Sequence, residues 1–170
     1  IKNIDVAFIC TPSKFHVSEA IKLLKKDINL FIEKPLGSSL KNISELKKII
    51  KKKHNLKTMM GFQLKFNPII LKLKKLISNN TIGKIYSVHI HHGEHIDDFH
   101  PYEKYNTSYA ARKELGGGVV LTQIHEIDYL IFLFKKYKVK VLNKFSSKIS
   151  NLNINVEDNL VAYLKLEDKK

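Results

Sequence analysis

Lys34 is the residue of this sequence whose setting most suggests chemistry. It lies in the stretch LFIEKPLG, residues 30–37, where an apolar run is followed by Glu33, Lys34 and Pro35. Proline disfavours helical backbone for the residue before it, so Pro35 should hold Lys34 extended at the end of a strand. A lysine presented in this way can polarise a substrate oxygen or relay a proton. The alternative is an ordinary surface lysine, because the chain has 30 basic residues.

His125 is the second candidate, in the stretch GGGVVLTQIHEIDYL, residues 116–130. Its reference pKa of about 6.5 allows an imidazole to gain or lose a proton near neutral pH. Helical spacing places it on one face with Thr122 and Tyr129, and Asp128, three residues further on, could orient the imidazole. The preceding glycines would permit close backbone approach and leave amide donors free. A helical histidine alone is more often structural, so its pairing with Lys34 carries the hypothesis.

The elements that would position these residues begin with an alternation of strands and helices. Strands are predicted at 6–10, 28–32 and 57–62, and helices at 16–26 and from Ser39 onward. The strands are runs of apolar residues, as in a parallel sheet that is covered on both faces, and Ser13 is the expected cap of the first helix. This order predicts a doubly wound parallel sheet. Ligands bind such sheets at the carboxyl ends of the strands, where Thr11 and Lys34 lie.

The pattern changes near residue 66 to that of an α+β unit. The expected elements are a helix from Pro68, a strand at 84–92, a long loop at 93–115, a helix at 119–134 and strands near 138–149 and 156–167. The alternation in the first strand indicates one covered face. The loop is too aromatic for disorder and is expected to be functional.

Composition narrows the possible partners and compartments. The 170 residues are 44% hydrophobic, which allows a real core. The net charge of +14 suggests nucleic acid, but Arg112 is the single arginine, and arginine dominates nucleic-acid recognition, so no nucleic-acid partner is expected. Cys10 is the single cysteine, which fits a reducing, cytoplasmic setting. No apolar run reaches the roughly 20 residues of a membrane span.

Five motifs occur in order along the chain: AFICTPSKFHVSEAIKLL, FIEKPLG, GFQLKFNP, GKI and GGGVVLTQIHEID. Together they resemble the Gfo/Idh/MocA family of NAD(P)-dependent oxidoreductases over essentially the whole chain. The resemblance implies an α/β Rossmann-type parallel sheet, of which residues 1–66 are the second half. It also implies an α+β domain with a mostly antiparallel sheet, for substrate binding and oligomerisation, at residues 67–170. Residues 100–118 further resemble a branch associated with nucleotide-sugar and surface-polysaccharide biosynthesis.

The resemblance also implies roles for individual residues. Contacts to NAD or NADP are expected from Thr11, Pro12, His16, Glu33, Lys34, Pro35 and Gln63. Contacts to substrate are expected from Lys34, His100, Tyr102, Arg112, Thr122 and His125. His125 would be the general acid/base and Lys34 the polarising and proton-relay partner, in hydride transfer between nicotinamide and a hydroxyl or keto carbon of a sugar, nucleotide sugar or cyclitol. A homodimer or homotetramer is expected.

The sequence also departs from the family pattern. Thr122 stands where an aspartate is common, and Lys65 where arginine is frequent. No GxGxxG loop occurs and the first residue is not methionine, so we expect a fragment that is open at both ends and holds a dinucleotide poorly.

Two alternatives remain open. The first is a regulatory protein that binds the dinucleotide without turnover, which Thr122 makes possible. The second is a metal site in the His-rich stretch HIHHGEHIDDFH, residues 89–100, whose imidazoles and carboxylates could instead contact a sugar. Sugar contact is the preferred reading of this stretch, and no metal is expected.

Overall fold

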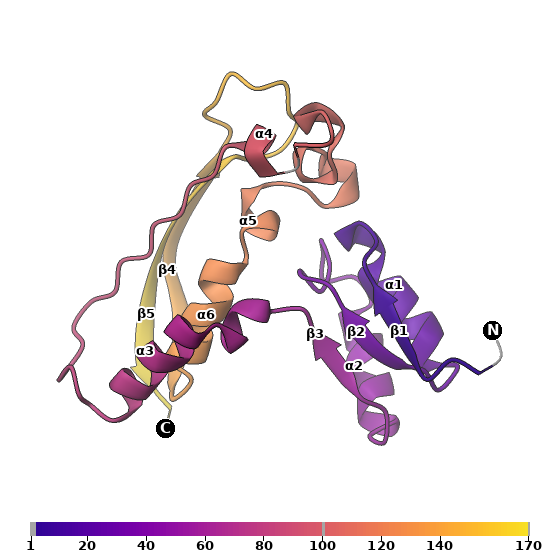
Figure 1. Cartoon of the computed structure of the whole chain (residues 1–170), viewed down its shortest axis with the longest axis horizontal. Coiled ribbons are helices and arrows are strands. Elements are labelled where there is room, and N and C mark those ends of the chain that lie inside the picture. Colours follow the sequence, from indigo (N-terminus) through magenta and orange to yellow (C-terminus); the bar gives the residue numbers. More distant parts are fainter. Residues whose placement is uncertain (1–2, 100, 170) are drawn as a thin grey trace.

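The computed structural model describes residues 3–99 and 101–169. Figure 1 shows a parallel sheet with its helices on one side of the molecule and an antiparallel pair of strands with its helices on the other. No helix in these described ranges is long and apolar enough to cross a membrane.

The first unit is a three-stranded parallel sheet in the order β1-β2-β3. Its strands are β1 (Val6–Ile9), β2 (Asn29–Ile32) and β3 (Thr58–Met60), connected by α1 (Ser13–Leu24) and α2 (Ile43–Lys52). The predicted alternation is therefore confirmed, with strand ends shifted by one or two residues. The second helix begins at Ile43 and not at Ser39, whose hydroxyl instead accepts a hydrogen bond from the Lys41 amide.

The core of this unit lies between the sheet and its two helices. Its buried side chains are Ile9, Val17, Ala20, Ile21, Leu24, Ile28, Leu30, Ile32 and Leu46. Side chains alternate across a strand, so Phe8 and Phe31 point to the opposite face, where their rings lie 5.3 Å apart and Phe8 is 70% exposed. The expectation that both faces of the sheet are covered is wrong for the described residues, because both helices pack on the same face.

The second unit follows a 3-10 turn, η1 (Gln63–Phe66). Its longer elements are α3 (Pro68–Ser78), α6 (His125–Leu133) and the antiparallel strands β4 (Tyr137–Ser147) and β5 (Asn159–Asp168). Four short turns, α4 (Ile96–Phe99), η2 (Tyr105–Thr107), η3 (Tyr109–Ala111) and η4 (Lys113–Leu115), fill the predicted loop. Helix α6 lies against β4 in Figure 1, and α3 packs on α6.

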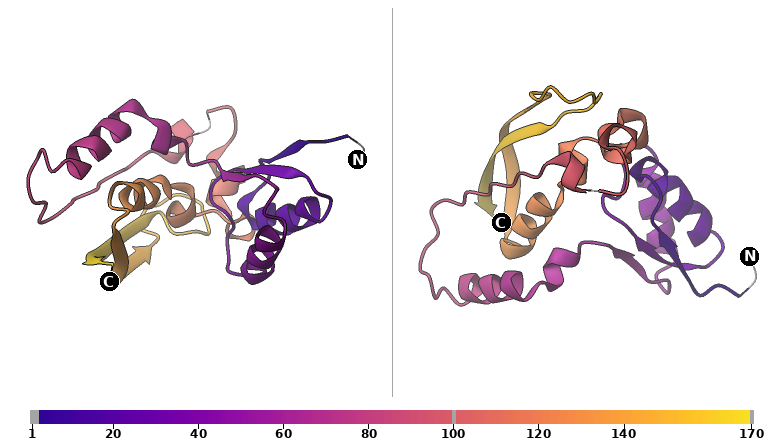
Figure 2. Two further views of the ribbon diagram at one scale, coloured as in Figure 1. Left: turned by 90° about the horizontal axis from the view of Figure 1, so that it is seen from below. Right: turned by 45° about the horizontal axis from the view of Figure 1, so that its top comes forward.

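Two expectations for the second unit are wrong. The segment 84–92 forms no strand, because no described strand lies beside it to complete a ladder; Figure 2 shows it as part of the long connection from α3 to α4. The single helix expected at 119–134 is divided into α5 (Val119–Thr122) and α6, with a break at Gln123 and Ile124. The break removes the regular spacing that placed Thr122 and His125 on one face.

Leu24 provides a test of the core. It is 0% exposed, so Leu24→Ala should lower the free energy of unfolding by about 2 to 5 kcal/mol through lost burial and the cavity left behind. Urea denaturation followed by circular dichroism measures this. Leu40→Ala is the matched control, because Leu40 is 88% exposed and its truncation should change stability by no more than about 0.5 kcal/mol. Equal losses in the free energy of unfolding for the two variants would contradict the burial of Leu24 in this core.

Candidate active site

The carboxyl ends of the three parallel strands form one polar edge. The ladder extends past β2, since the Glu33 amide donates to the Ile9 carbonyl at 2.9 Å and the Gly61 amide donates to the Ile32 carbonyl at 2.8 Å. A Cβ at Gly61 would lie 2.7 Å from Glu33 Oε2, so the glycine permits the Glu33 carboxylate to pack against β3. This carboxyl edge carries the predicted Thr11, Glu33, Lys34 and Gln63.

His16 joins two of the turns at this edge. The side chain is 1% exposed, its Nδ1 lies 2.7 Å from the Pro35 carbonyl and its Nε2 lies 2.6 Å from the Thr11 carbonyl. Both ring nitrogens therefore face backbone oxygens, and His16 sits behind the Thr11-Pro12 turn. Thr11 is exposed and donates its hydroxyl to Glu19.

Lys34 crosses from the parallel sheet to the second unit. Its Nζ donates a 2.7 Å hydrogen bond to the backbone carbonyl of Thr122 at the end of α5. Burial lowers the pKa of Lys34 below its ordinary value, and the negative charges of Glu33, Glu126 and Glu94 oppose that shift. The amine is thus half-buried, fixed at one atom and more easily deprotonated than a surface lysine.

Thr122 contributes its backbone to the site. The side chain is 8% exposed and its hydroxyl donates to the Gly118 carbonyl at 2.9 Å. The carbonyl oxygen of Thr122 is therefore the group that contacts Lys34, in place of the carboxylate that an aspartate would offer.

His125 begins α6 on the far side of Lys34. Its Nε2 lies 3.4 Å from the amide nitrogen of Gln63, and its ring meets the edge of Phe62 with centroids 6.3 Å apart. Its Nδ1 is buried and has no hydrogen-bond partner among the described residues. Burial and the nearby Lys34 charge lower the pKa of His125, against the opposing charges of Glu126, Glu33 and Asp128. The imidazole is consequently biased toward its neutral form.

Asp128 does not orient His125, contrary to the expectation from their spacing. Its Oδ1 forms a 2.7 Å ion pair with Lys65 of η1. The reason is tertiary, because η1 brings a cation against the first turn of α6 that the helical spacing could not reveal.

The three glycines before α5 serve packing within the chain. Gly116 and Gly118 have φ of +84° and +101°, values that favour glycine. The expected free amides are occupied, because Val119 donates to the Glu157 carbonyl at 3.0 Å and Val120 to the Glu157 side chain at 3.3 Å. Ser13, expected to cap α1, is instead the first residue of that helix and donates its hydroxyl to the Gly116 carbonyl at 3.1 Å.

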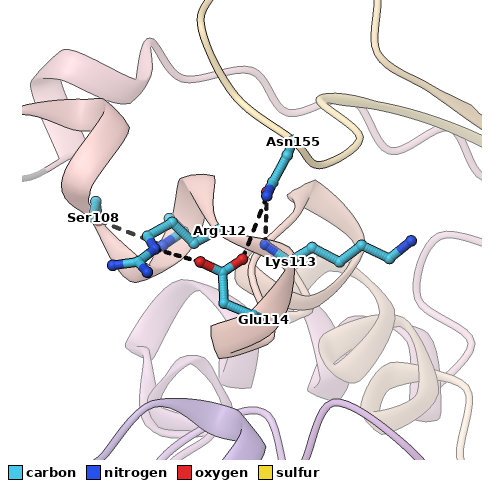
Figure 3. A network of polar contacts seen from close by, with 6 residues as sticks. Ser108, Arg112, Lys113, Glu114 and Asn155 are labelled. Carbon is cyan, nitrogen blue, oxygen red and sulfur yellow. Dashed lines mark hydrogen bonds and ion pairs between the residues drawn. The ribbon is translucent and has the colours of Figure 1, made fainter.

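Three predicted substrate residues remain, of which the structure describes Tyr102 and Arg112. His100 is outside the described residues. Tyr102 is 81% exposed. The Arg112 guanidinium donates to Glu114 at 2.7 Å, within the network of Figure 3 that also joins Glu114 and the Lys113 amide to Asn155. In this arrangement Asn155 joins the turn at η4 to the loop between β4 and β5, and Arg112 pairs with Glu114 of the same turn.

Two further carboxylates lie near the centre: Glu94 belongs to the stretch 89–100 that was expected to contact a sugar, whereas Glu126 was missed by the sequence reasoning. Glu94 accepts a 2.9 Å hydrogen bond from Gln123, and Glu126 lies 3.8 Å from His92 Nδ1. Glu94 also lines a cavity of about 310 Å³, together with Thr122 and Gln123. The described residues contain no group of three or more His, Cys, Asp or Glu side chains placed to hold a metal ion. The clustering of polar residues at 89–100 was a usable signal for Glu94, but the contacts of Glu126 required the fold.

These parts match known proteins along almost the whole chain. A model described as an oxidoreductase family with an NAD-binding Rossmann fold matches residues 1–62, and a model of the GFO/IDH/MocA C-terminal domain matches residues 70–170. The chain belongs to the GFO/IDH/MocA oxidoreductase family. The predicted resemblance and fold class are thereby confirmed.

Individual relatives are similar over less than half of their own length. Inositol 2-dehydrogenase of Salmonella paratyphi B (strain ATCC BAA-1250 / SPB7) is 27% identical over 142 residues, 82% of this chain and 39% of that protein. The 2,7-anhydro-N-acetylneuraminate hydratase of Mediterraneibacter gnavus is 26% identical over 132 residues, 78% of this chain and 34% of that protein. The solved myo-inositol 2-dehydrogenase of Lactobacillus plantarum superposes with a TM-score of 0.77 at 27% identity, covering 97% of this chain and 48% of that one.

Gly116 gives a test of the packing that places α5. A Cβ there would overlap the Ser13 hydroxyl and lie 2.7 Å from Ser38 Cβ, whereas Gly83, with φ of +73°, has no atom within 4 Å. Gly83→Ala should therefore cost only the backbone strain of about 1 to 2 kcal/mol. Gly116→Ala should cost at least about 1 kcal/mol more through overpacking, measured as the free energy of unfolding in urea. A difference of zero would show that Gly116 is needed for its φ alone.

Proposed function

We propose that the intact protein is an NAD- or NADP-dependent oxidoreductase that transfers hydride between a nicotinamide cofactor and the CH–OH or keto carbon of a sugar, nucleotide sugar or cyclitol. The observation that carries this proposal is the proximity of Lys34 to His125, close enough for the ammonium charge to act on the imidazole. Lys34 reaches across to the end of α5, directly before the helix that begins with His125. A cationic amine and a neutral imidazole at one site are the groups that alcohol oxidation requires.

The side chains at the carboxyl edge fit the nicotinamide end of such a cofactor. The Gln63 amide and the Glu33 carboxylate offer a hydrogen-bond donor and acceptors, and Thr11 and Pro12 would lie toward the ribose. Pro35 and His16 would hold these turns in place from behind. When bound, the cofactor supplies the hydride acceptor or donor. Residues 1–66 would then be the second half of the dinucleotide-binding domain and residues 67–170 the substrate and oligomerisation domain.

The residues of this chain would move the proton. His125 would take the substrate hydroxyl proton on Nε2, because its Nδ1 is buried. The Lys34 ammonium would stabilise the alkoxide character that develops on the substrate oxygen, and its lowered pKa would let it pass a proton onward. In the direction of ketone reduction both groups would act in reverse, with His125 as the acid.

A secondary alcohol on a polyhydroxylated ring is the substrate class best supported. The relatives include inositol dehydrogenases, and the glutamates whose charges act on Lys34, namely Glu33, Glu94 and Glu126, offer acceptors for the hydroxyls of such a ring. If Tyr102, Arg112 and His100 contact the substrate as predicted, they would bind the bulkier part of a larger substrate. We further propose a homodimer or homotetramer for the intact protein.

A second function is favoured by one observation at Thr122. Threonine has no carboxylate that could pair with Lys34, and the Thr122 hydroxyl is already hydrogen-bonded to the Gly118 carbonyl. A protein that binds the dinucleotide without turnover would tolerate this arrangement. Cofactor binding without any NAD(P)-linked reaction on a panel of inositols, aldoses and nucleotide sugars would favour that function over the enzyme.

Substitution of the two central residues tests the enzyme directly. Lys34→Ala and His125→Ala should each lower kcat in the intact protein by at least about 100-fold, the lower end for loss of a positioned acid or base. Lys22→Ala, on the exposed side of α1, is the matched lysine control and should leave kcat unchanged. Near-normal rates in both central variants would remove Lys34 and His125 from the mechanism.

The pH dependence follows from the lowered pKa of His125. Alcohol oxidation needs the neutral imidazole, so the acidic limb of kcat/KM should lie below the ordinary histidine value of about 6.5, with a fall of about tenfold per pH unit. Ketone reduction needs the imidazolium, so its rate should fall as pH rises through the same pKa. Steady-state kinetics in both directions measure this. An acidic limb centred above 6.5 would contradict the environment described for His125.

A further inference from the structure

The first turn of α6 rests on residues from the other unit. Phe62 meets the His125 ring edge-on, with an interplanar angle of 81°, and Gln63 faces its Nε2. Lys65 lies over the Phe62 ring, 4.8 Å from its centroid, and ends 2.7 Å from Asp128 Oδ1. One short segment, residues 62–65, therefore contacts both the imidazole and the carboxylate of α6.

Three buried side-chain atoms in this turn lack hydrogen-bond partners among the described residues: His125 Nδ1, Glu126 Oε2 and Asp128 Oδ2. His125 and Asp128 are three positions apart in one helix, a spacing that places side chains next to each other. A histidine next to a carboxylate ordinarily donates Nδ1–H to it. Here the other oxygen of Asp128 is bound by Lys65, and the Asp128 side chain is only 11% exposed.

We propose that Lys65 is a positioning residue: its ion pair with Asp128 Oδ1 fixes the carboxylate in an orientation in which the free oxygen, Oδ2, does not accept a hydrogen bond from His125 Nδ1. This inference rests on the proposed function, in which His125 is the general acid/base. It adds that the proton affinity of His125, which burial and Lys34 lower, is also adjusted by a residue that does not contact the imidazole. Lys65 and Asp128 form one unit with the histidine, joined across the two halves of the chain.

The charges around His125 explain why the ion pair matters. Lys34 and Glu33 face it from the end of β2, Glu126 and Asp128 from its own helix, and Lys65 approaches through Asp128. An opposite charge within about 4 to 6 Å stabilises a protonated imidazole by one to three pKa units. Neutralised by Lys65, Asp128 gives little of this stabilisation. Released from Lys65, it would give more, and the histidine would be protonated at a higher pH.

The test is an NMR titration of the intact protein carrying isotope-labelled histidine. The His125 resonances are assigned by their loss in His125→Gln, and the pKa is read from chemical shift against pH. Lys65→Met keeps an unbranched side chain over Phe62 but removes the cation, and it should raise the pKa of His125 by about 1 unit or more. Lys65→Arg restores the cation and should leave the pKa unchanged. The double variant Lys65→Met with Asp128→Asn should return it to the wild-type value or lower.

Lys74 is the matched control on the same helix interface. Its Nζ lies 3.6 Å from the centroid of the Phe132 ring on α6. Lys74 is thus a second lysine packed on this helix, but the ion pair with Asp128 is formed by Lys65. Lys74→Met should leave the pKa of His125 unchanged. A similar rise in this variant would show a general loss of positive charge and overturn the proposal.

Other outcomes also decide the question. A folded Lys65→Met variant with the wild-type His125 pKa overturns the proposal, as does a raised pKa that persists in the double variant. Should Lys65→Met fail to fold, Lys65→Gln is measured against the same two limits. In an active protein, the acidic limb of kcat/KM for oxidation should move to higher pH by the same amount as the NMR pKa. The titration needs no turnover, so an inactive protein that shows these shifts would refute the proposed function and leave the control of His125 by Lys65 standing.

Discussion

The hydrogen bond from the Lys34 ammonium to the Thr122 carbonyl is the contact on which the arrangement of this protein's centre depends. It connects the end of a buried parallel strand to the end of a short helix in the other half of the chain. A buried ammonium without a partner would be strongly unfavourable. The bond therefore both satisfies Lys34 and fixes the distance between the carboxyl edge and α6, which begins three residues after Thr122.

The rest of the centre supports that contact from two sides. On one side, His16 and Ser13 tie the turns of the parallel sheet to each other and to Gly116. On the other, the ion pair of Lys65 and Asp128 fixes the first turn of α6. Both supports are partly or fully buried, where charge-assisted and backbone hydrogen bonds are stronger than at an exposed surface. A small displacement of either would separate the amine from the imidazole.

The substitution of threonine for the common aspartate is consistent with this geometry. The backbone carbonyl of Thr122 offers Lys34 a neutral acceptor, whereas a carboxylate close to the amine would favour its charged form. The charges that remain near Lys34 come from Glu33, Glu94 and Glu126, which lie on three different segments. The negative charges near Lys34 are thus distributed around its amine. Thr122, which accepts the hydrogen bond from Lys34, carries none of them.

Much of this could be predicted from residue order alone. The parallel sheet, the lysine at its carboxyl edge and the histidine after the glycines follow from apolar runs, proline and glycine positions, and these are local properties. Partners across the chain could not be predicted in this way. Helical spacing assigned Asp128 to His125, but a lysine from η1 binds it first. The alternation at 84–92 predicted a strand, but a strand exists only where a neighbour pairs with it. The sequence by itself determined which residues are candidates for the chemistry. Only the tertiary structure decided which of them touch, because charge pairing and burial depend on segments that are distant in the chain.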